Sequence, residues 1–214
     1  MELIDAMTTV GTCREFSPEP VPDDVLRRAF DAARFGPQGG NRQPVRFVIV
    51  RDPAHKRQLK EWYLVPWKAY LAAATSGQIK TGSSRLDRLA TRADRFAEHL
   101  DEAPAIVVVC AELAGIHPTD HELGRLSVVG GASIYPIVQN FMLACRDLGV
   151  GTALTTLLCA YEPQVKELLG IPDGIITTAH IAIGYPADGF PKRLERRPVE
   201  ELVFAERYGT PLFA

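Results

Sequence analysis

The chain has 214 residues, of which 46% are hydrophobic and 23% are charged, and its formal net charge at pH 7 is −2. These values are typical of one globular domain with a sizeable core, and they give no general attraction to nucleic acid or to anionic membranes. No apolar run approaches the roughly 20 residues that cross a bilayer. The acidic start at residues 1–5 lacks the basic region of a signal peptide, so we expect a cytoplasmic protein with no membrane partner.

The first half of the chain predicts three helices and one strand. Val25, Leu26 and Ala29 belong to an apolar stripe with the helical period, which starts after Pro22. The third helix is expected to be kinked or split at Pro66, because proline removes a backbone donor. The helices are expected at residues 2–8, 22–35 and 54–73 and the strand at residues 45–51, and a polar loop follows at residues 75–84.

The second half predicts three more helices and two strands. A run of β-branched residues at 104–110 indicates a strand that is covered on both faces. The longest apolar helix, at residues 132–148, is expected to stop at Gly149. The other helices are expected at residues 85–102 and 162–169 and the last strand at residues 175–184, with irregular structure at residues 111–129.

Two local patterns in this half need interpretation. Gly149-Val150-Gly151 starts like a dinucleotide-binding fingerprint, but Leu154 stands where the third glycine belongs and the motif follows a helix instead of a strand. We therefore expect a bend that leads into Thr155-Thr156. His180 lies in the last expected strand, where we expect a core or interface histidine whose hydrogen bonds are satisfied.

The order of these elements indicates the fold class. Helices outnumber strands and separate them, which is typical of an α+β or α/β domain. The tail from residue 186 is rich in proline and arginine, and its scattered aromatic residues cannot form a core of their own. We expect this tail to pack on another surface, most simply that of a second copy of the chain.

Three segments carry residues that could bind a ligand, and each also has an ordinary structural explanation. Arg14 supplies a permanent charge and a planar fork of donors, although a surface ion pair explains it equally well. In the turn at residues 36–44, glycines let the backbone approach a flat ligand and Asn41 and Gln43 offer amide groups. A plain helix-to-strand connection uses the same residue types. The basic run at residues 191–198 suits a phosphate, although short charge runs are usually solvated.

The sequence offers no convincing metal site. His117 and His121 are separated by Pro118, which disrupts the helix that would present them together. The four cysteines are too far apart in the sequence to form a zinc or redox pair. Cys110 and Cys145 lie in apolar patterns and are expected in the core.

Several short motifs, taken in order, resemble those of the nitroreductase family of FMN-dependent oxidoreductases. Each motif is loose alone, but their order and their spread over nearly the whole chain make the resemblance specific. The matching residues are Thr12, Arg14 and Phe16, the turn at residues 36–44, Gln139-Asn140, Gly149-Val150-Gly151, Gly170-Ile171-Pro172, Gly184-Tyr185-Pro186 and Arg196-Arg197-Pro198.

The resemblance implies an α+β fold that forms one domain over residues 1–214, with a central, mostly antiparallel sheet flanked by helices. It also implies an intertwined homodimer, which binds FMN at the subunit interface and exchanges the tails at residues 186–214. The segment at residues 75–92 falls where the family varies most, which makes it a candidate lid over the substrate face.

The resemblance further implies which residues bind the flavin ring. Arg14 matches a Lys or Arg near flavin N1 and O2. The other matches are Pro37, Gln38 and Gly39 along the ring, the polar residues Asn41 and Gln43 after them, and Thr155 and Thr156 near the position whose backbone faces flavin N5.

The matches to the family's phosphate ligands are incomplete. Thr12 matches a Ser at the phosphate or ribityl region, Arg196 matches a phosphate-binding Arg, and Arg193 is a candidate second ligand. The family's paired Arg residues before that Ser are Val10-Gly11 in this chain, so one or two phosphate contacts are missing.

By resemblance, NADH or NADPH would deliver hydride to flavin N5, and a small acceptor such as a nitroaromatic or a quinone would then be reduced. Arg14 would stabilise the negative charge of the reduced ring, and no catalytic side chain is required. The alternatives are ene reduction, dehalogenation or flavin breakdown on the same flavin, or a non-catalytic protein that sequesters flavin. The overall charge disfavours a nucleic-acid binder.

Overall fold

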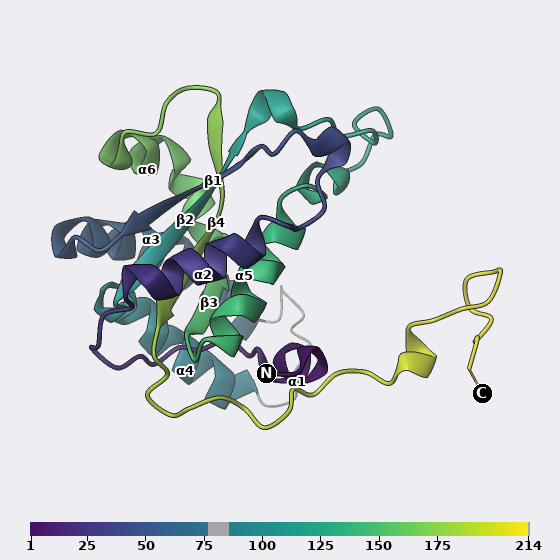
Figure 1. Cartoon of the computed structure of the whole chain (residues 1–214), viewed down its shortest axis with the longest axis horizontal. Coiled ribbons are helices and arrows are strands. Elements are labelled where there is room, and N and C mark those ends of the chain that lie inside the picture. Colours follow the sequence, from purple (N-terminus) through teal and green to yellow (C-terminus); the bar gives the residue numbers. More distant parts are fainter. Residues whose placement is uncertain (77–85, 214) are drawn as a thin grey trace.

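A four-stranded sheet with helices on both faces forms the centre of the computed structural model, which describes residues 1–76 and 86–213 (Figure 1). Every neighbouring pair of strands is antiparallel, and the strand order is β1-β2-β4-β3. The strands are β1 (Val45–Val50), β2 (Ala105–Glu112), β3 (Gly151–Thr155) and β4 (Ile175–Gly184). This arrangement confirms the expected α+β class.

The two faces of the sheet carry separate apolar cores, because successive strand residues point to opposite sides. On one face, Val107 and Ile181 pack with Phe141 under α2 and α5. On the other face, Val108 and Ala182 pack under α3, α4 and α6. The helices are α1 (Leu3–Thr9), α2 (Asp23–Ala33), α3 (Pro53–Thr75), α4 (Leu86–Glu98), α5 (Tyr135–Asp147) and α6 (Glu162–Leu169).

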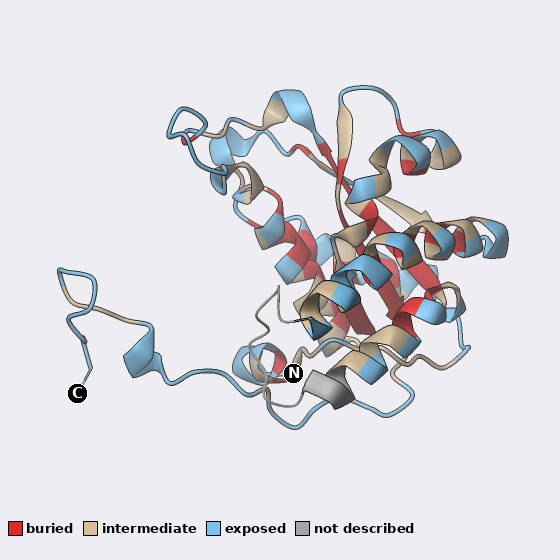
Figure 2. Cartoon of the chain, turned by 180° about the vertical axis from the view of Figure 1, so that it is seen from behind, coloured by how far each residue is buried: buried red, intermediate tan, exposed pale blue. Residues whose placement is uncertain are grey.

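The central strand β2 was predicted to be covered on both faces, and this prediction is confirmed. Seven of its eight residues are buried, and they alternate between the two cores. Figure 2 shows the buried residues concentrated in the sheet and on the inner faces of the helices. Burial of this β-branched strand between two helical layers is the main apolar contribution to the fold.

One expectation about local structure is wrong, and one of the two alternatives at Pro66, a kink or a split, is excluded. Residues 151–155 form the edge strand β3 instead of a bend, because their backbone pairs with β4 along its whole length. Pro66 does not split α3, which runs without interruption through 23 residues. A single proline removes one helix hydrogen bond, and packing of Leu59 and Trp67 in the core holds the helix together on both sides of it.

His180 also differs from its expectation. Its side chain is buried in β4, but neither ring nitrogen has a hydrogen-bond partner in the described part of the chain. Burial lowers the pKa of His180 to about 4, because the charged imidazolium is disfavoured away from water. The histidine is therefore neutral in the folded protein at neutral pH, and its expected hydrogen bonds are not made.

The C-terminal tail leaves the body of the molecule after residue 198 (Figures 1 and 2). Its beginning is still attached, since the Leu194 amide donates to the Thr8 carbonyl at 2.8 Å. Farther on, the tail forms a small hairpin in which the Ala205 amide donates to the Thr210 carbonyl at 2.8 Å. Tyr208 in this hairpin is 95% exposed. The tail thus offers apolar surface to another molecule, and its exchange between subunits stays a prediction.

The candidate lid at residues 75–92 falls partly outside the described residues, at 77–85. Its two ends are the last turn of α3 and the first part of α4. None of the helices in the described ranges has the length and apolar character needed to cross a membrane.

We predict that His180→Leu makes the stability of the protein less sensitive to acid. Between pH 6.5 and about 4, the unfolded chain binds a proton at His180 that the folded chain does not, so the parent protein loses stability as the pH falls. Across this pH window, the free energy of unfolding of the variant should fall by about 3 kcal/mol less than that of the parent protein. Urea unfolding at a series of pH values measures the difference, and identical pH slopes for the two proteins would contradict it.

Candidate functional site

A cavity of about 500 Å³ lies between the segment after α1, α4 and the start of the C-terminal tail. Three guanidinium groups from these separate elements line it: Arg14, Arg92 and Arg196. Two carboxylates, those of Glu15 and Asp188, line it as well. An anion with more than one negative charge would match this lining.

The backbone of residues 12–17 is held against the edge of the sheet, and this fixes Arg14. The Cys13 amide donates to the Thr152 carbonyl at 2.9 Å, and the Ser17 amide donates to the Tyr185 carbonyl at 2.8 Å. Gly151 allows this close approach, because a Cβ atom there would lie 2.8 Å from Cys13 Cβ. The Arg14 side chain therefore projects from a rigid support.

Arg14 is half-buried and makes no ion pair with any residue in the described ranges. Its pKa is lowered, first by burial and then by the positive charge of Arg92. A guanidinium that is partly removed from water without a counter-charge is costly, and a bound anion would offset that cost.

A second cavity, of about 330 Å³, shares Thr12 and Arg14 with the first one. Thr155 and Thr156 line it at the end of β3. Its remaining walls are mostly apolar and aromatic, and they come from Tyr63, Trp67, Tyr70, Phe96, Leu154 and Leu157. A polar edge beside aromatic walls suits a flat, partly polar ring system.

Helix α3 builds the aromatic wall, since residues 63, 67 and 70 recur with the helical spacing on one side of it. The Tyr63 and Trp67 rings lie nearly parallel, with centroids 6.4 Å apart. Trp67 Nε1 donates to Asp94 Oδ1 on α4 at 2.8 Å. Burial raises the pKa of Tyr63, so its hydroxyl stays protonated at neutral pH.

The turn at residues 37–43 lies at the other end of the molecule, between α2 and β1 (Figure 1). Gly40, Asn41 and Gln43 have φ angles of 60°, 52° and 51°, in the left-handed region that non-glycine residues rarely adopt. The Gly39 amide donates to Ser133 Oγ at 3.0 Å. Buried Gln38 Oε1 has no hydrogen-bond partner among the described residues. Such strain and an unpaired oxygen are typical of a ligand-binding turn.

The structure thus brings some of the predicted residues together and leaves others apart. Thr12, Arg14, Thr155 and Thr156 line the second cavity, and Arg196 joins Thr12 and Arg14 in the first. Arg193 lines a separate shallow groove with Arg196. The residues of the distant turn line neither cavity: Pro37, Gln38, Gly39, Asn41 and Gln43.

The sequence analysis missed the aromatic wall and Arg92. The spacing of Tyr63, Trp67 and Tyr70 could have indicated one aromatic face on the expected helix. Nothing in the sequence distinguishes Arg92 from the other charged residues of α4, because its role depends on where the helix lies.

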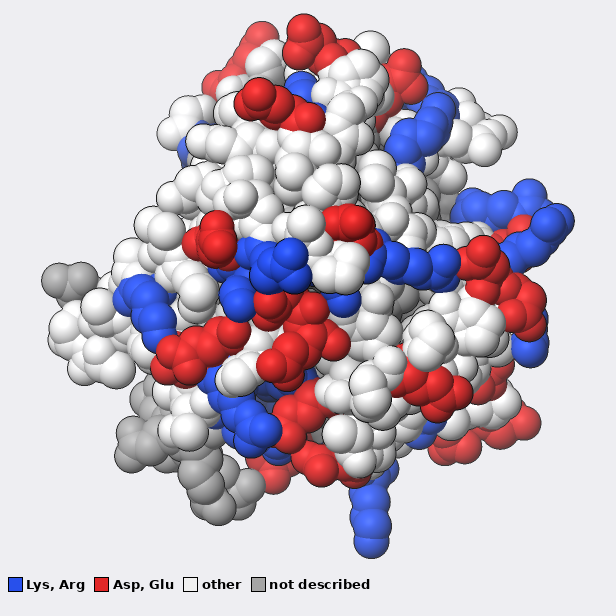
Figure 3. Space-filling view, turned by 90° about the vertical axis from the view of Figure 1, so that its left-hand side faces the viewer, with Lys and Arg blue, Asp and Glu red and all other residues white. Residues whose placement is uncertain are grey.

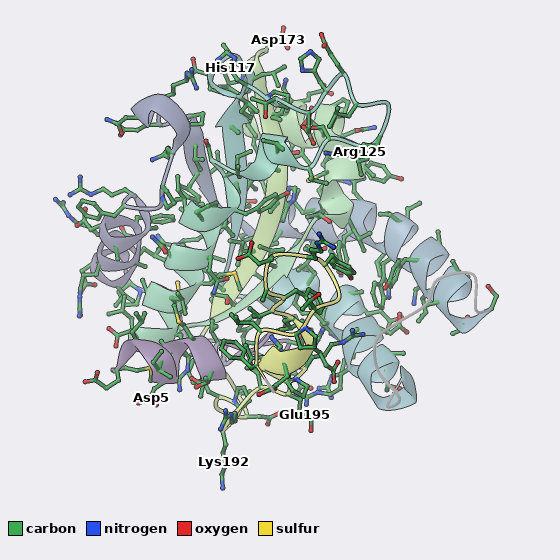
Figure 4. The ribbon with its side chains drawn as sticks, turned by 90° about the vertical axis from the view of Figure 1, so that its right-hand side faces the viewer. Asp5, His117, Arg125, Asp173, Lys192 and Glu195 are labelled. Atoms are coloured by element: carbon green, nitrogen blue, oxygen red, sulfur yellow. The ribbon has the colours of Figure 1, made fainter. Side chains whose placement is uncertain are left out.

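The histidines His117 and His121 line neither cavity. In Figure 4, His117 lies at the opposite end of the molecule from Lys192, which extends into solvent. No group of three or more His, Cys, Asp or Glu residues outside the undescribed segments could hold a metal ion. On the face shown in Figure 3, basic and acidic side chains are interspersed.

The model of the nitroreductase family matches residues 11–185 of the chain. The chain belongs to the nitroreductase family. This match includes residues 11–15 of the first cavity, the β3 residues of the second cavity and the distant turn, so the family resemblance inferred from the short motifs is confirmed.

Members of the family with different names resemble this chain along nearly its whole length. A Thermus thermophilus protein named NADH dehydrogenase is 29% identical, with coverage of 95% of this chain and 97% of the relative. The iodotyrosine deiodinase of Nematostella vectensis is 26% identical over 94% of this chain and 74% of its own length. The structure of an NADPH:FMN oxidoreductase from Vibrio harveyi, complexed with NAD+, superposes with a TM-score of 0.67 at 19% identity and covers 96% of this chain and 77% of that one.

Proposed function

We propose that this chain binds FMN between two identical subunits and transfers hydride from NADH or NADPH to a small acceptor such as a nitroaromatic or a quinone. The main support for the proposal is that two features typical of ligand-binding sites lie far apart within one chain. Arg14 lacks a counter-charge at one end, and the strained turn at residues 37–43 has an unpaired oxygen at the other. A second copy of the chain can bring the two features to the same ligand.

The enzyme class itself is confirmed. The chain is a nitroreductase-family oxidoreductase, as its family match and its relatives named NADH dehydrogenase and NADPH:FMN oxidoreductase indicate. The cofactor is accordingly FMN and the co-substrate is NADH or NADPH, and the residues of the site should fit this combination.

The residues of the two cavities fit FMN. Thr12 and Arg196 would hold the phosphate and ribityl end, Arg14 would lie at the polar edge of the ring, and the aromatic cavity would hold the ring against Thr155 and Thr156. Arg193 lies close to Arg196 and stays a weaker candidate for the phosphate. Bound FMN supplies two-electron chemistry, in which a hydride is taken from NAD(P)H and passed to the acceptor.

The protein's own residues would position the ring and stabilise charge. The Arg14 guanidinium, fixed by the backbone of residues 12–17, would stabilise negative charge at the polar edge of the reduced ring. Tyr63 and Thr155 line the same cavity and would contact the ring together. The aromatic wall would exclude water from the ring face.

A homodimer would complete the site with the partner's turn and would cover exposed apolar surface. Gly39 is suited to contact a ring, because it carries no side chain on an exposed turn. Phe35 and Leu126 are 73% and 85% exposed, and Tyr208 on the tail is even more so. Patches of this kind favour association of two chains.

The aromatic walls favour a flat, apolar acceptor, which supports nitroaromatics and quinones. The similarity to an iodotyrosine deiodinase supports reductive dehalogenation as the second candidate. Ene reduction and flavin breakdown use the same site, and a flavin-sequestering protein would bind FMN without oxidising NAD(P)H. Steady-state NADH and NADPH consumption with nitro, quinone, ene and halogenated acceptors separates these functions.

We further propose a cytoplasmic location and no nucleic-acid partner. All four cysteines are free, which is usual in a reducing compartment. The net charge of −2 and the mixed surface charges favour neither nucleic acid nor an anionic membrane.

Arg14→Gln is predicted to slow flavin reduction by NADH or NADPH by more than about tenfold, because the stabilising charge at the ring edge is lost. Stopped-flow bleaching of the flavin absorbance measures the rate. Circular dichroism provides the control for folding, and parent-like reduction of a folded variant would remove Arg14 from this role.

A heterodimer of two inactive variants is predicted to recover activity. Gly39→Leu should leave the fold intact, because a Cβ atom there would have no heavy atom nearer than 3.5 Å in its own chain. The same side chain would obstruct a ring that is bound by the partner. The heterodimer combines one Gly39→Leu chain with one Arg14→Gln chain. If each site uses Arg14 of one chain and the turn of the other, one site carries both defects and the other carries neither.

Co-expression of the two variants with different affinity tags allows the heterodimer to be purified and its flavin content and NAD(P)H oxidation to be measured. Each variant expressed alone is the control. If the heterodimer is as inactive as both homodimers, the turn and Arg14 do not serve the same ligand across subunits.

A further inference from the structure

We propose that Arg92 binds the phosphate of FMN and replaces a cation that the chain lacks at residues 10 and 11. Arg92 lies on α4, far in sequence from the phosphate motifs, yet it lines the same cavity as Thr12 and Arg196. This inference rests on the proposed function, because it assigns a further residue to the same cofactor.

The space beside Gly11 explains why an arginine does not stand there. A Cβ atom on Gly11 would lie 2.9 Å from Pro191 Cγ and 3.1 Å from Leu194 Cδ2. The start of the tail therefore packs directly on this glycine. A long side chain at position 11 would press on the segment that brings Arg196 to the cavity.

The charges around the cavity favour an anion near Arg92. Arg92 is close enough to Arg14 for its charge to lower the pKa of the Arg14 guanidinium. Two neighbouring guanidinium groups repel each other when no anion lies between them. A phosphate monoester carries up to two negative charges and can accept hydrogen bonds from both groups.

Among the residues that the structure describes, the one ion-pair partner of Arg92 is Asp188, and the pair is loose. Arg92 Nη2 lies 3.6 Å from Asp188 Oδ2, and the two side chains are 57% and 69% exposed. Exposed ion pairs of this length contribute little to stability. The pair holds the guanidinium at the cavity and leaves most of its donors free for a phosphate. It also offsets part of the charge of Asp188, which would otherwise repel the ligand.

The 2′-phosphate of NADPH has the same chemistry as the phosphate of FMN. The shared lining by Thr12 and Arg196, which match phosphate-binding residues of the family, favours the FMN phosphate. If Arg92 binds the FMN phosphate, its replacement should weaken the binding of FMN but not of riboflavin. If it binds the 2′-phosphate of NADPH, its replacement should affect NADPH but not NADH.

The test compares FMN with riboflavin, which lacks the phosphate. The dissociation constants of both are measured by fluorescence titration of the flavin-free protein, for the parent and for Arg92→Gln. We expect FMN to bind the variant roughly tenfold to a hundredfold more weakly, since a charge-assisted contact is lost, while riboflavin affinity stays the same. Arg196→Gln is the positive control for a phosphate contact, and Arg92→Lys should recover part of the affinity.

Asp188→Asn is the matched control for the ion pair. It breaks the same pair but keeps the guanidinium, so FMN should bind it as tightly as the parent or more tightly. If Asp188→Asn weakens FMN as much as Arg92→Gln does, the arginine acts only through the ion pair and the inference is overturned. Equal losses for FMN and riboflavin, or no loss for either, would also overturn it.

Two further outcomes separate this inference from its alternatives. If Arg92→Gln raises the KM for NADPH but not for NADH, and FMN affinity is unchanged, Arg92 recognises the nicotinamide cofactor and the inference is wrong. If the parent protein binds neither FMN nor riboflavin, the proposed function fails before Arg92 is tested.

Discussion

A half-buried guanidinium without a counter-charge is the constraint on which the rest of this account depends. Arg14 lies where the two cavities meet, one lined by arginines and the other by aromatic rings. Hydrogen bonds from residues 13 and 17 to the sheet edge hold the backbone around it in place. Holding such a charge partly away from water lowers the stability of the folded protein, but the same charge stabilises a bound anionic ligand. A flavin phosphate with an electron-accepting ring is a ligand of this kind.

In the proposed function, each of two distant places in the fold would provide one half of a site, and a two-fold dimer would join them. In a two-fold dimer, the same patch of both chains takes part in the interface, so each composite site occurs twice. Asn41 and Gln43 have a left-handed backbone, and Gln38 Oε1 has no hydrogen-bond partner among the described residues. Their cost is understandable if the partner's ligand offsets it. The exposed tail hairpin is consistent with the same association.

The sequence was informative where local patterns decide the structure. The β-branched run of β2 and the apolar period of α5 predicted a doubly covered strand and a buried helix, and both are present. Thr12, Arg14 and Arg196 were named from motifs, and the structure places them around one cavity. Backbone pairing, however, depends on neighbours that are remote in sequence. Residues 151–155 form the strand β3 because β4 provides its partner.

Residues that act through their position in space could not be predicted in the same way. Arg92 is one charge among many on α4, and only the packing of that helix beside residues 10–15 gives it a place in the cavity. The hydrogen-bond status of His180 likewise depends on what surrounds it in the packed sheet. Patterns in the sequence indicate that a residue is buried, but they do not indicate whether it has a hydrogen-bond partner in the folded protein.

The most direct test of the two-chain flavin site is the mass and the visible absorbance of the purified protein, recorded together on one gel-filtration peak by light scattering. This account predicts the mass of a dimer with bound FMN in proportion to the number of chains, after incubation with FMN if the protein is purified without it. A monomer that retains FMN, or a dimer that stays colourless in the presence of FMN, would contradict it.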